Sequence, residues 1–150
     1  MPMTDAQLLE RMNRHVPPTA LLLGTRILSV DSAAGRVRMS FQPSEQMINP
    51  MGNVQGGFLV AMLDDAAAIA AIVKSGKRIA IPTIELKTSF FAPAKAGMTL
   101  YADAVCLKLG KRVAFMEAEL RDEAGTLLAK LSTSAVPIPL PDDAIFVETT

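Results

Sequence analysis

The pattern of apolar and polar positions divides the chain into two helices and six strands. Thr4-Asp5-Ala6-Gln7 has the form of a capping box, and apolar residues at helical spacing follow it, which predicts a short amphipathic helix over about residues 4–15. Elsewhere, runs with strand character are separated by short polar or glycine-containing turns. These runs cover residues 21–30, 36–41, 79–91, 98–108, 112–121 and 127–136.

The longest apolar segment predicts a central helix. It begins at Gly56 or Gly57, continues to Lys74 and is followed by Gly76, a typical C-terminal stop. Because it is apolar nearly all round, it must be enclosed on most sides, in a small domain usually by a curling sheet. We therefore expect one α+β domain over residues 1–150, with an antiparallel sheet packed on one central helix. Its core covers about residues 20–137, and an extended tail covers residues 138–150.

Composition and charge narrow the classes of partner. Half of the 150 residues are hydrophobic, which favours an oligomer that covers part of the apolar surface. The formal net charge is zero, so a nucleic-acid partner is not expected. With one cysteine, Cys106, and one histidine, His15, the chain has no disulfide pair and no zinc ligand set. The first residues lack the pattern of a signal peptide, and the apolar segment is short and carries two aspartates. We expect a cytoplasmic protein without metal, cofactor or membrane contact.

Two adjacent aspartates interrupt the apolar helix. Asp64 shares its helical face with Gly57 and several alanines, whereas Asp65 shares its face with Phe58, Met62 and other bulky residues. Asp64 therefore faces something that needs room, either a substrate or a closely packed partner helix, and Asp65 faces the core. A buried carboxylate is costly unless it is paired or functional. Many such acids only hold structure, so Asp64 needs further support as a catalytic group.

That support comes from the start of the same helix. Gly56 and Gly57 precede Asp64 by about two turns, where unpaired backbone N–H groups and the positive end of the helix dipole can hold a developing oxyanion. A carboxylate and an oxyanion site on one helix predict acyl-transfer chemistry.

Several short segments occur with a characteristic spacing. They are Asn49-Pro-Met-Gly-Asn-Val-Gln-Gly-Gly57 followed by Asp64, then Pro82-Thr-Ile-Glu-Leu86, Phe90-Phe-Ala-Pro93, Gly97, Gly110-Lys111 and Gly125. In these segments, the chain between about residues 49 and 136 resembles the hotdog-fold acyl-CoA thioesterases of the phenylacetate-degradation type. The resemblance implies a hotdog fold, with an antiparallel sheet wrapped around one long helix, and hydrolysis of an acyl-CoA to a free acid and CoA.

The resemblance also implies roles for individual residues. Asn49 and the Gly56 N–H polarise the thioester carbonyl, Asp64 activates water or attacks directly, and Thr83 positions the water. In such enzymes the helix-start residues and the carboxylate come from different protomers, so a homo-oligomer, dimer or tetramer, is required.

Gln55 stands where the resembled family usually has a histidine. A glutamine donates a hydrogen bond to the thioester or the leaving thiolate but transfers no proton at neutral pH. Gly57 and Met51 are expected to line the substrate site. Lys111 and Arg112, in a turn, are expected to hold phosphates of coenzyme A.

Two other functions fit the same fold. One is a non-catalytic acyl-CoA binding module, and the other is a hydratase or dehydratase, although that chemistry generally needs a histidine and none follows residue 15. The sequence leaves open whether the acyl group is aromatic or aliphatic, and whether its carrier is CoA or acyl carrier protein.

Overall fold

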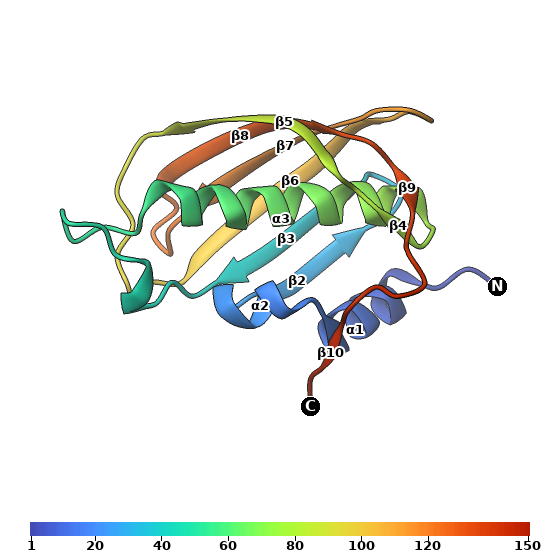
Figure 1. Ribbon diagram of the computed structural model, residues 1–150, viewed down its shortest axis with the longest axis horizontal. Helices are drawn as coiled ribbons and strands as arrows, with labels where there is room; N and C mark the ends of the chain where they lie inside the picture. Colours follow the sequence, from blue (N-terminus) through green and yellow to red (C-terminus); the bar gives the residue numbers. More distant parts are fainter.

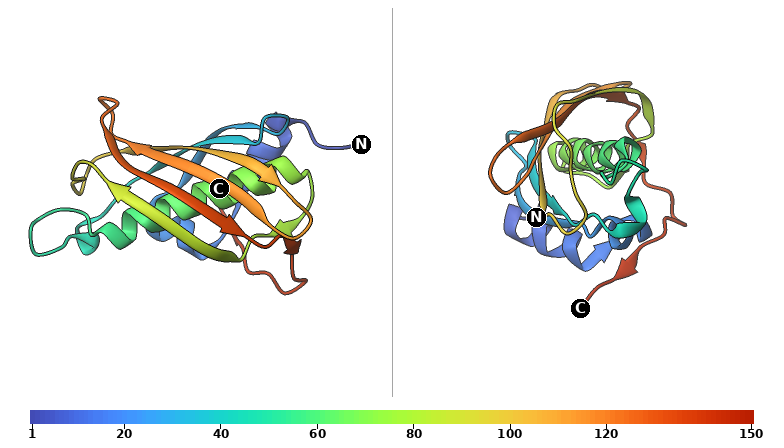
Figure 2. Two further views of the ribbon diagram at one scale, coloured as in Figure 1. Left: turned by 90° about the horizontal axis from the view of Figure 1, so that it is seen from above. Right: turned by 90° about the vertical axis from the view of Figure 1, so that its left-hand side faces the viewer.

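The computed structural model describes residues 1–150 and places one long helix inside a curved antiparallel sheet (Figure 1). The helix, α3, spans Gly56–Ser75. Six strands form the sheet in the order β2-β3-β6-β7-β8-β5, and the end-on view shows the sheet curling around α3 (Figure 2). The arrangement confirms the α+β class and the hotdog fold. The strands are β2 (Arg26–Asp31), β3 (Arg36–Phe41), β5 (Thr83–Phe90), β6 (Leu100–Leu109), β7 (Ala114–Arg121) and β8 (Leu127–Ala135).

The apolar character of α3 is explained by its burial in the core. The helix ends at Gly76, whose φ of 62° is left-handed, as the sequence predicts. By length and composition alone α3 would pass for a membrane span, but here the sheet encloses it as a core helix. Its buried side chains are Leu59, Met62, Leu63, Ala66, Ala67, Ala70, Ala71 and Val73.

The two edges of the sheet differ in protection. Helix α1 (Asp5–Arg14) begins with the predicted capping box at Thr4 and packs beside the edge strand β2. The Asn13 side chain donates to the carbonyl of Ile27 and accepts from its N–H, at 2.8 and 2.9 Å, as a neighbouring strand would. The opposite edge strand, β5, has no such cover in the chain. The free edge of β5 is therefore the place where another strand can pair.

Two predicted strands begin later than expected. Residues 18–23 form a short helix, α2 (Pro18–Leu23), because Pro18 suits a first helical turn and Gly24 ends it with a φ of 62°. The run at 79–91 is split by Pro82, which has no N–H for the sheet. Its first part is a separate strand, β4 (Ile79–Ala80), and the sheet strand β5 begins at Thr83.

The tail pairs with the rest of the chain. Strand β9 (Ile138–Pro139) pairs with β4, and β10 (Val147–Glu148) pairs with β1 (His15–Val16) next to α1. Thr149 adds two hydrogen bonds: its N–H donates to the carbonyl of Arg14, and its hydroxyl donates to the carbonyl of Asn13. The tail therefore crosses below one end of α3 and closes that side of the molecule (Figure 1).

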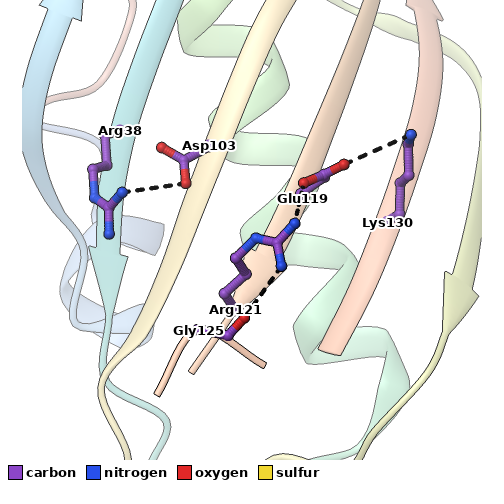
Figure 3. A network of polar contacts seen from close by, with 6 residues as sticks. All are labelled: Arg38, Asp103, Glu119, Arg121, Gly125 and Lys130. Atoms are coloured by element: carbon purple, nitrogen blue, oxygen red, sulfur yellow. Dashed lines mark hydrogen bonds and ion pairs between the residues drawn. The ribbon is translucent and has the colours of Figure 1, made fainter. Parts of the chain in front are cut away.

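The outer face of the sheet carries exposed ion pairs (Figure 3). Arg38 lies 3.4 Å from Asp103, and Glu119 lies 2.7 Å from Arg121 and 3.7 Å from Lys130. Because these groups are well exposed, each pair contributes about 0–1 kcal/mol. The outward position of Glu119 agrees with its alternation with apolar residues along β7.

Candidate active site

The Asp64 carboxylate lies against the first residue of an edge strand. Thr83 donates a hydrogen bond from its hydroxyl to Oδ1 of Asp64, over 3.1 Å. Asp64 is partly exposed and Thr83 is exposed, so both remain open to a ligand. The sequence separates these residues by 19 positions, and Pro82, by ending β4 before β5, places Thr83 beside the middle of α3. The pair can therefore hold a carboxylate in a fixed orientation at an accessible surface.

Asp65 lies on a different face of α3. Burial, together with the adjacent Asp64 charge, raises the pKa of Asp65 from 3.8 to about 6. It accepts no hydrogen bond and forms no ion pair within the chain. The two aspartates thus lie on different faces of α3, as the helical spacing predicts, but Asp65 is half-buried and lines a cavity instead of packing in the core.

The loop before α3 is held in a defined shape by Asn49. Its Oδ1 accepts hydrogen bonds from the N–H groups of Met51 and Asn53, at 3.0 and 3.1 Å, and its N–H donates to the Asn53 carbonyl. Lys95 contacts the Asn53 side chain from a neighbouring loop. These bonds occupy Oδ1 and leave Nδ2 of Asn49 without an acceptor in the chain, so that group can donate to a ligand.

The start of α3 has unpaired donors beside an aromatic ring. The N–H groups of Gly56 and Gly57 have no acceptor in the chain, and the first bonded amide is that of Phe58, which donates to the Gln55 carbonyl. A Cβ at Gly56 would lie 3.1 Å from the Phe90 ring, so the ring packs directly on the glycine. Asn49, Gly56 and Phe90 line one pocket of about 350 Å³, which we call the helix-start pocket. Donors at a helix start suit an anion or a carbonyl oxygen that gains negative charge.

The chain does not bring the two halves of this arrangement together. Eight residues at 1.5 Å each separate Gly56 from Asp64 by about 12 Å along α3. Asp64 and Thr83 are absent from the lining of the helix-start pocket. Gln55 and Gly57 are exposed at the helix start, and Met51 projects from the loop with 81% of its surface exposed. Asn49, Gln55 and Gly56 thus form one group, and Asp64 and Thr83 form another.

Lys111 and Arg112 lie at the Thr83 end of the sheet. Thr83 pairs with Ala135, which pairs with Ala114 at the start of β7, just after the turn that carries the two basic residues. The turn is therefore about two strand spacings, or roughly 10 Å, from the strand that holds Thr83. Both basic side chains are exposed.

Sequence reasoning missed Phe90 and Lys95 as parts of the helix-start pocket and its loop. Phe90 belongs to the Phe90-Phe91-Ala92-Pro93 segment, which is part of the family resemblance but has no predicted role in the site. Its contact with Gly56 joins residues 34 positions apart. Lys95 lies in a turn with no pattern that would mark it. No group of three or more His, Cys, Asp or Glu side chains that could hold a metal occurs in the chain.

Comparison with known proteins decides the family. A family model described as the thioesterase superfamily matches residues 51–129, a segment that includes Gly56, Asp64 and Thr83. The chain belongs to the thioesterase superfamily, and it is a thioester hydrolase.

Individual relatives agree with this assignment. A phenylacetic acid degradation-related protein of Ralstonia eutropha is 33% identical, with a TM-score of 0.78 over 87% of this chain and 97% of that one. Acyl-coenzyme A thioesterase 13 of Homo sapiens is 26% identical over 106 residues, which cover 70% of this chain and 75% of the relative. The smu.793 protein of Streptococcus mutans, solved with acetyl CoA, is 16% identical, with a TM-score of 0.70 over 79% of this chain and 91% of that one, and shares the fold.

Proposed function

We propose that this thioesterase hydrolyses acyl-CoA at a site shared between two protomers. Asp64 and Thr83 of one protomer would act together with Asn49, Gln55 and Gly56 of the partner subunit. The observation that carries the proposal is the separation of two ordered half-sites by about 12 Å along α3. Neither half alone contains both a carboxylate and oxyanion donors.

The free edge of β5 is the surface through which the protomers pair. Helix α1 and Asn13 cover the β2 edge, whereas β5 is unpaired on its outer side. Large apolar side chains on and next to β5 are exposed: Ile84, Phe90 and Phe91, by 54%, 52% and 60%. An eight-residue edge strand with exposed apolar residues is the usual template for adding another strand.

Two-fold symmetry then brings the half-sites together. In a symmetric antiparallel pair centred between Leu86 and Lys87, Thr83 faces Phe90 of the partner subunit. Within each chain, Thr83 contacts Asp64 and Phe90 contacts Gly56. The helix start of the partner therefore arrives near Asp64, and each dimer contains two equivalent sites. Whether two such dimers form a tetramer does not change this geometry.

The reaction follows from the positions of these groups. The thioester carbonyl oxygen accepts hydrogen bonds from the N–H of Gly56 and Nδ2 of Asn49, both of the partner subunit, which stabilise the oxyanion. Asp64, oriented by Thr83, takes a proton from water while the water oxygen bonds to the carbonyl carbon. The tetrahedral intermediate then collapses, the C–S bond breaks, and the thiolate leaves with its electron pair. Asp64 or solvent returns a proton to the thiolate. Direct attack by Asp64 on the carbonyl is the alternative first step and uses the same geometry.

Substrate contacts are assigned from the same arrangement. The side chain of Gln55 of the partner subunit donates to the leaving sulfur, which needs no proton because a thiolate is a good leaving group. Gly57 and Met51 of the partner subunit border the acyl group. Lys111 and Arg112, near the Thr83 end of the sheet, hold the phosphates of coenzyme A. Support for this carrier comes from the acyl-coenzyme A thioesterase among the relatives and from the bound acetyl CoA of the smu.793 protein.

The test is release of free thiol from a panel of aromatic and straight-chain acyl-CoA substrates. Asp64→Asn should lower turnover by on the order of a hundredfold or more, the range for loss of a positioned base. Asp65→Asn, on the same helix and one residue away, is the matched control and should keep turnover within about threefold, because its side chain faces the other side of α3. If Asp64→Asn retains the parental turnover while folded, the reaction centre lies elsewhere.

A further inference from the structure

A second cavity lies on another side of α3. It measures about 400 Å³, opens to solvent on one side and is bordered by α1, β1, α3, β4 and the C-terminal tail, and we call it the α1 cavity. None of Asn49, Gly56, Asp64 and Thr83 lines it. Leu140 and Phe146 of the tail form one wall, and the β4–β9 and β1–β10 pairs fasten that wall in place. The cavity is therefore distinct from the proposed reaction centre.

The inner walls of the α1 cavity are mostly apolar. Met12 contributes from α1, Met39 from β3, and Ile69 and Ile72 from α3. Apolar cavities of about 150 Å³ hold one benzene molecule, so this volume holds a hydrocarbon body of roughly a dozen heavy atoms. Exposed side chains belong to its lining, so the cavity opens to solvent, and mostly apolar clefts of about 300–1,000 Å³ are typical of sites for small organic molecules.

Two polar groups on these walls have no partner in the chain. The Thr25 hydroxyl is fully buried and makes no hydrogen bond. Asp65 lines the same cavity, is half-buried, and likewise has no donor and no ion pair in the chain. The Thr25 hydroxyl is thus an unsatisfied buried group, which is rare in native proteins.

The solvent side of the α1 cavity is cationic. Arg11 from α1 and Lys77 and Arg78, which follow α3, are exposed residues of its lining, and none of the three forms an ion pair. His15 lies at the same side. Three unpaired cations at the mouth of an apolar cavity match a ligand with one anionic end and an apolar body.

We propose that the α1 cavity binds an amphipathic monocarboxylate, with its hydrocarbon body inside and its carboxylate at Arg11, Lys77 and Arg78. The ligand is a free carboxylic acid of about eight to ten carbons, a size that the volume accommodates. The site goes beyond the proposed function, because thioester hydrolysis does not use it. A free acid is also the class of product that the reaction releases, so the site gives such a product a place to bind away from Asp64.

Asp65 makes this binding dependent on pH. The charge that acts on Asp65 most directly is that of Asp64 on its own helix. The other charged and titratable residues that line the cavity are Arg11 from α1, His15 from β1, and Lys77 and Arg78 after α3; β2, β3 and the tail supply none. Of these, Asp64 and Asp65 repel an anion. Protonation of Asp65 below about pH 6 removes one repulsive charge from the lining, so the monocarboxylate binds more tightly there.

The experiment is a calorimetric titration of the full chain with octanoate at about pH 7.5 and about pH 5.5, with octan-1-ol as the neutral analogue. Octanoate should bind, and octan-1-ol should bind at least about tenfold more weakly, because it makes no charge-assisted bond. Affinity for octanoate should rise about threefold or more at the lower pH, and Asp65→Asn should remove that difference. Arg78→Gln should weaken binding about tenfold, whereas Arg121→Gln, on the outer sheet face, should leave it unchanged.

Filling the cavity separates this site from the reaction centre. Ala68→Leu and Ile72→Phe each add side-chain volume to the α1 cavity, from different turns of α3. Of these two variants, at least one that keeps the parental melting temperature should reduce octanoate affinity about tenfold or more. The proposal is overturned by an absence of octanoate binding, by equal affinity for octan-1-ol, or by binding that the folded filled variants leave intact. None of these measurements requires thioester turnover, so failure of the proposed function and failure of this site are separate results.

Discussion

The Thr83 hydroxyl donates to Oδ1 of Asp64 over 3.1 Å and joins the first residue of β5 to the middle of α3. This bond fixes one oxygen of the carboxylate and leaves the other for a water molecule. It also ties the proposed base to the strand through which the protomers are proposed to pair. In the proposed dimer, assembly and catalysis would therefore depend on the same few residues.

Removing the Thr83 hydroxyl should lower turnover while leaving the fold intact. Thr83→Val keeps the shape but loses a hydrogen bond to a charged group, worth about 1.5–3 kcal/mol, which corresponds to roughly tenfold or more in rate if the bond persists in the transition state. Thr83→Ser retains the hydroxyl and should stay within a few-fold of the parent. Thiol release by both variants is the measurement, and equal rates for valine and serine would show that the bond does not orient the base.

Asp65 makes the stability of the fold depend on pH. A carboxyl whose pKa is raised on folding stabilises the folded state when protonated, and that stabilisation is lost as pH rises between about 4 and 6. The difference between 3.8 and about 6, at 1.36 kcal/mol per pKa unit, corresponds to about 3 kcal/mol.

Asp65→Asn should therefore be more stable than the parent at pH 7, by up to about 3 kcal/mol, and nearly equal to it at pH 3.5. Denaturant unfolding at both pH values is the measurement. Asp103→Asn, in an exposed ion pair, is the control and should change stability by at most about 1 kcal/mol. A variant less stable than the parent at pH 7 would mean that the Asp65 charge has a stabilising partner.

The two glycines at the helix start should respond differently to an added methyl group. At Gly57 a Cβ meets nothing within 4 Å, so Gly57→Ala should gain about 0.5–1 kcal/mol from lower backbone entropy in the unfolded chain. At Gly56 a Cβ would lie 3.1 Å from the Phe90 ring, so Gly56→Ala must shift the ring or the helix start. We expect a smaller gain in stability and a loss of turnover on the order of tenfold to a hundredfold, because displaced donors stabilise the oxyanion poorly.

Melting temperatures and thiol release for both alanine variants check this expectation. If Gly56→Ala is stabilised as much as Gly57→Ala and keeps the parental turnover, the contact with Phe90 does not constrain the oxyanion donors.

Local sequence patterns were sufficient for much of the fold. The capping box at Thr4, the bounds of α3 and its stop at Gly76 depend on neighbouring residues, and the structure contains all three. The different surroundings of Asp64 and Asp65 follow from helical periodicity alone. By contrast, the sequence pattern predicts a strand from residue 21 where α2 forms, because a short run of leucines fits either type of element.

Contacts between segments that are distant in the sequence could not be predicted from local patterns. The packing of Phe90 on Gly56 and the closure of the α1 cavity by Leu140 and Phe146 join residues that no local pattern relates. The separation of the two half-sites within one chain follows from helix geometry, but the pairing of Thr83 with Asp64 needed the position of β5. Only the assembled sheet gives that position.

Complementation between two inactive variants tests the shared site most directly. Asp64→Asn and Asn49→Ala each damage a different half-site, so each homodimer alone should have little activity. After the two proteins are mixed, unfolded and refolded together, half of the dimers are mixed, and each mixed dimer has one intact site. With random pairing, about one quarter of all sites are then intact, so thiol release should recover to about one quarter of the parental turnover. If the refolded mixture is no more active than the average of the two variants, both half-sites must act within one protomer and the shared site is wrong.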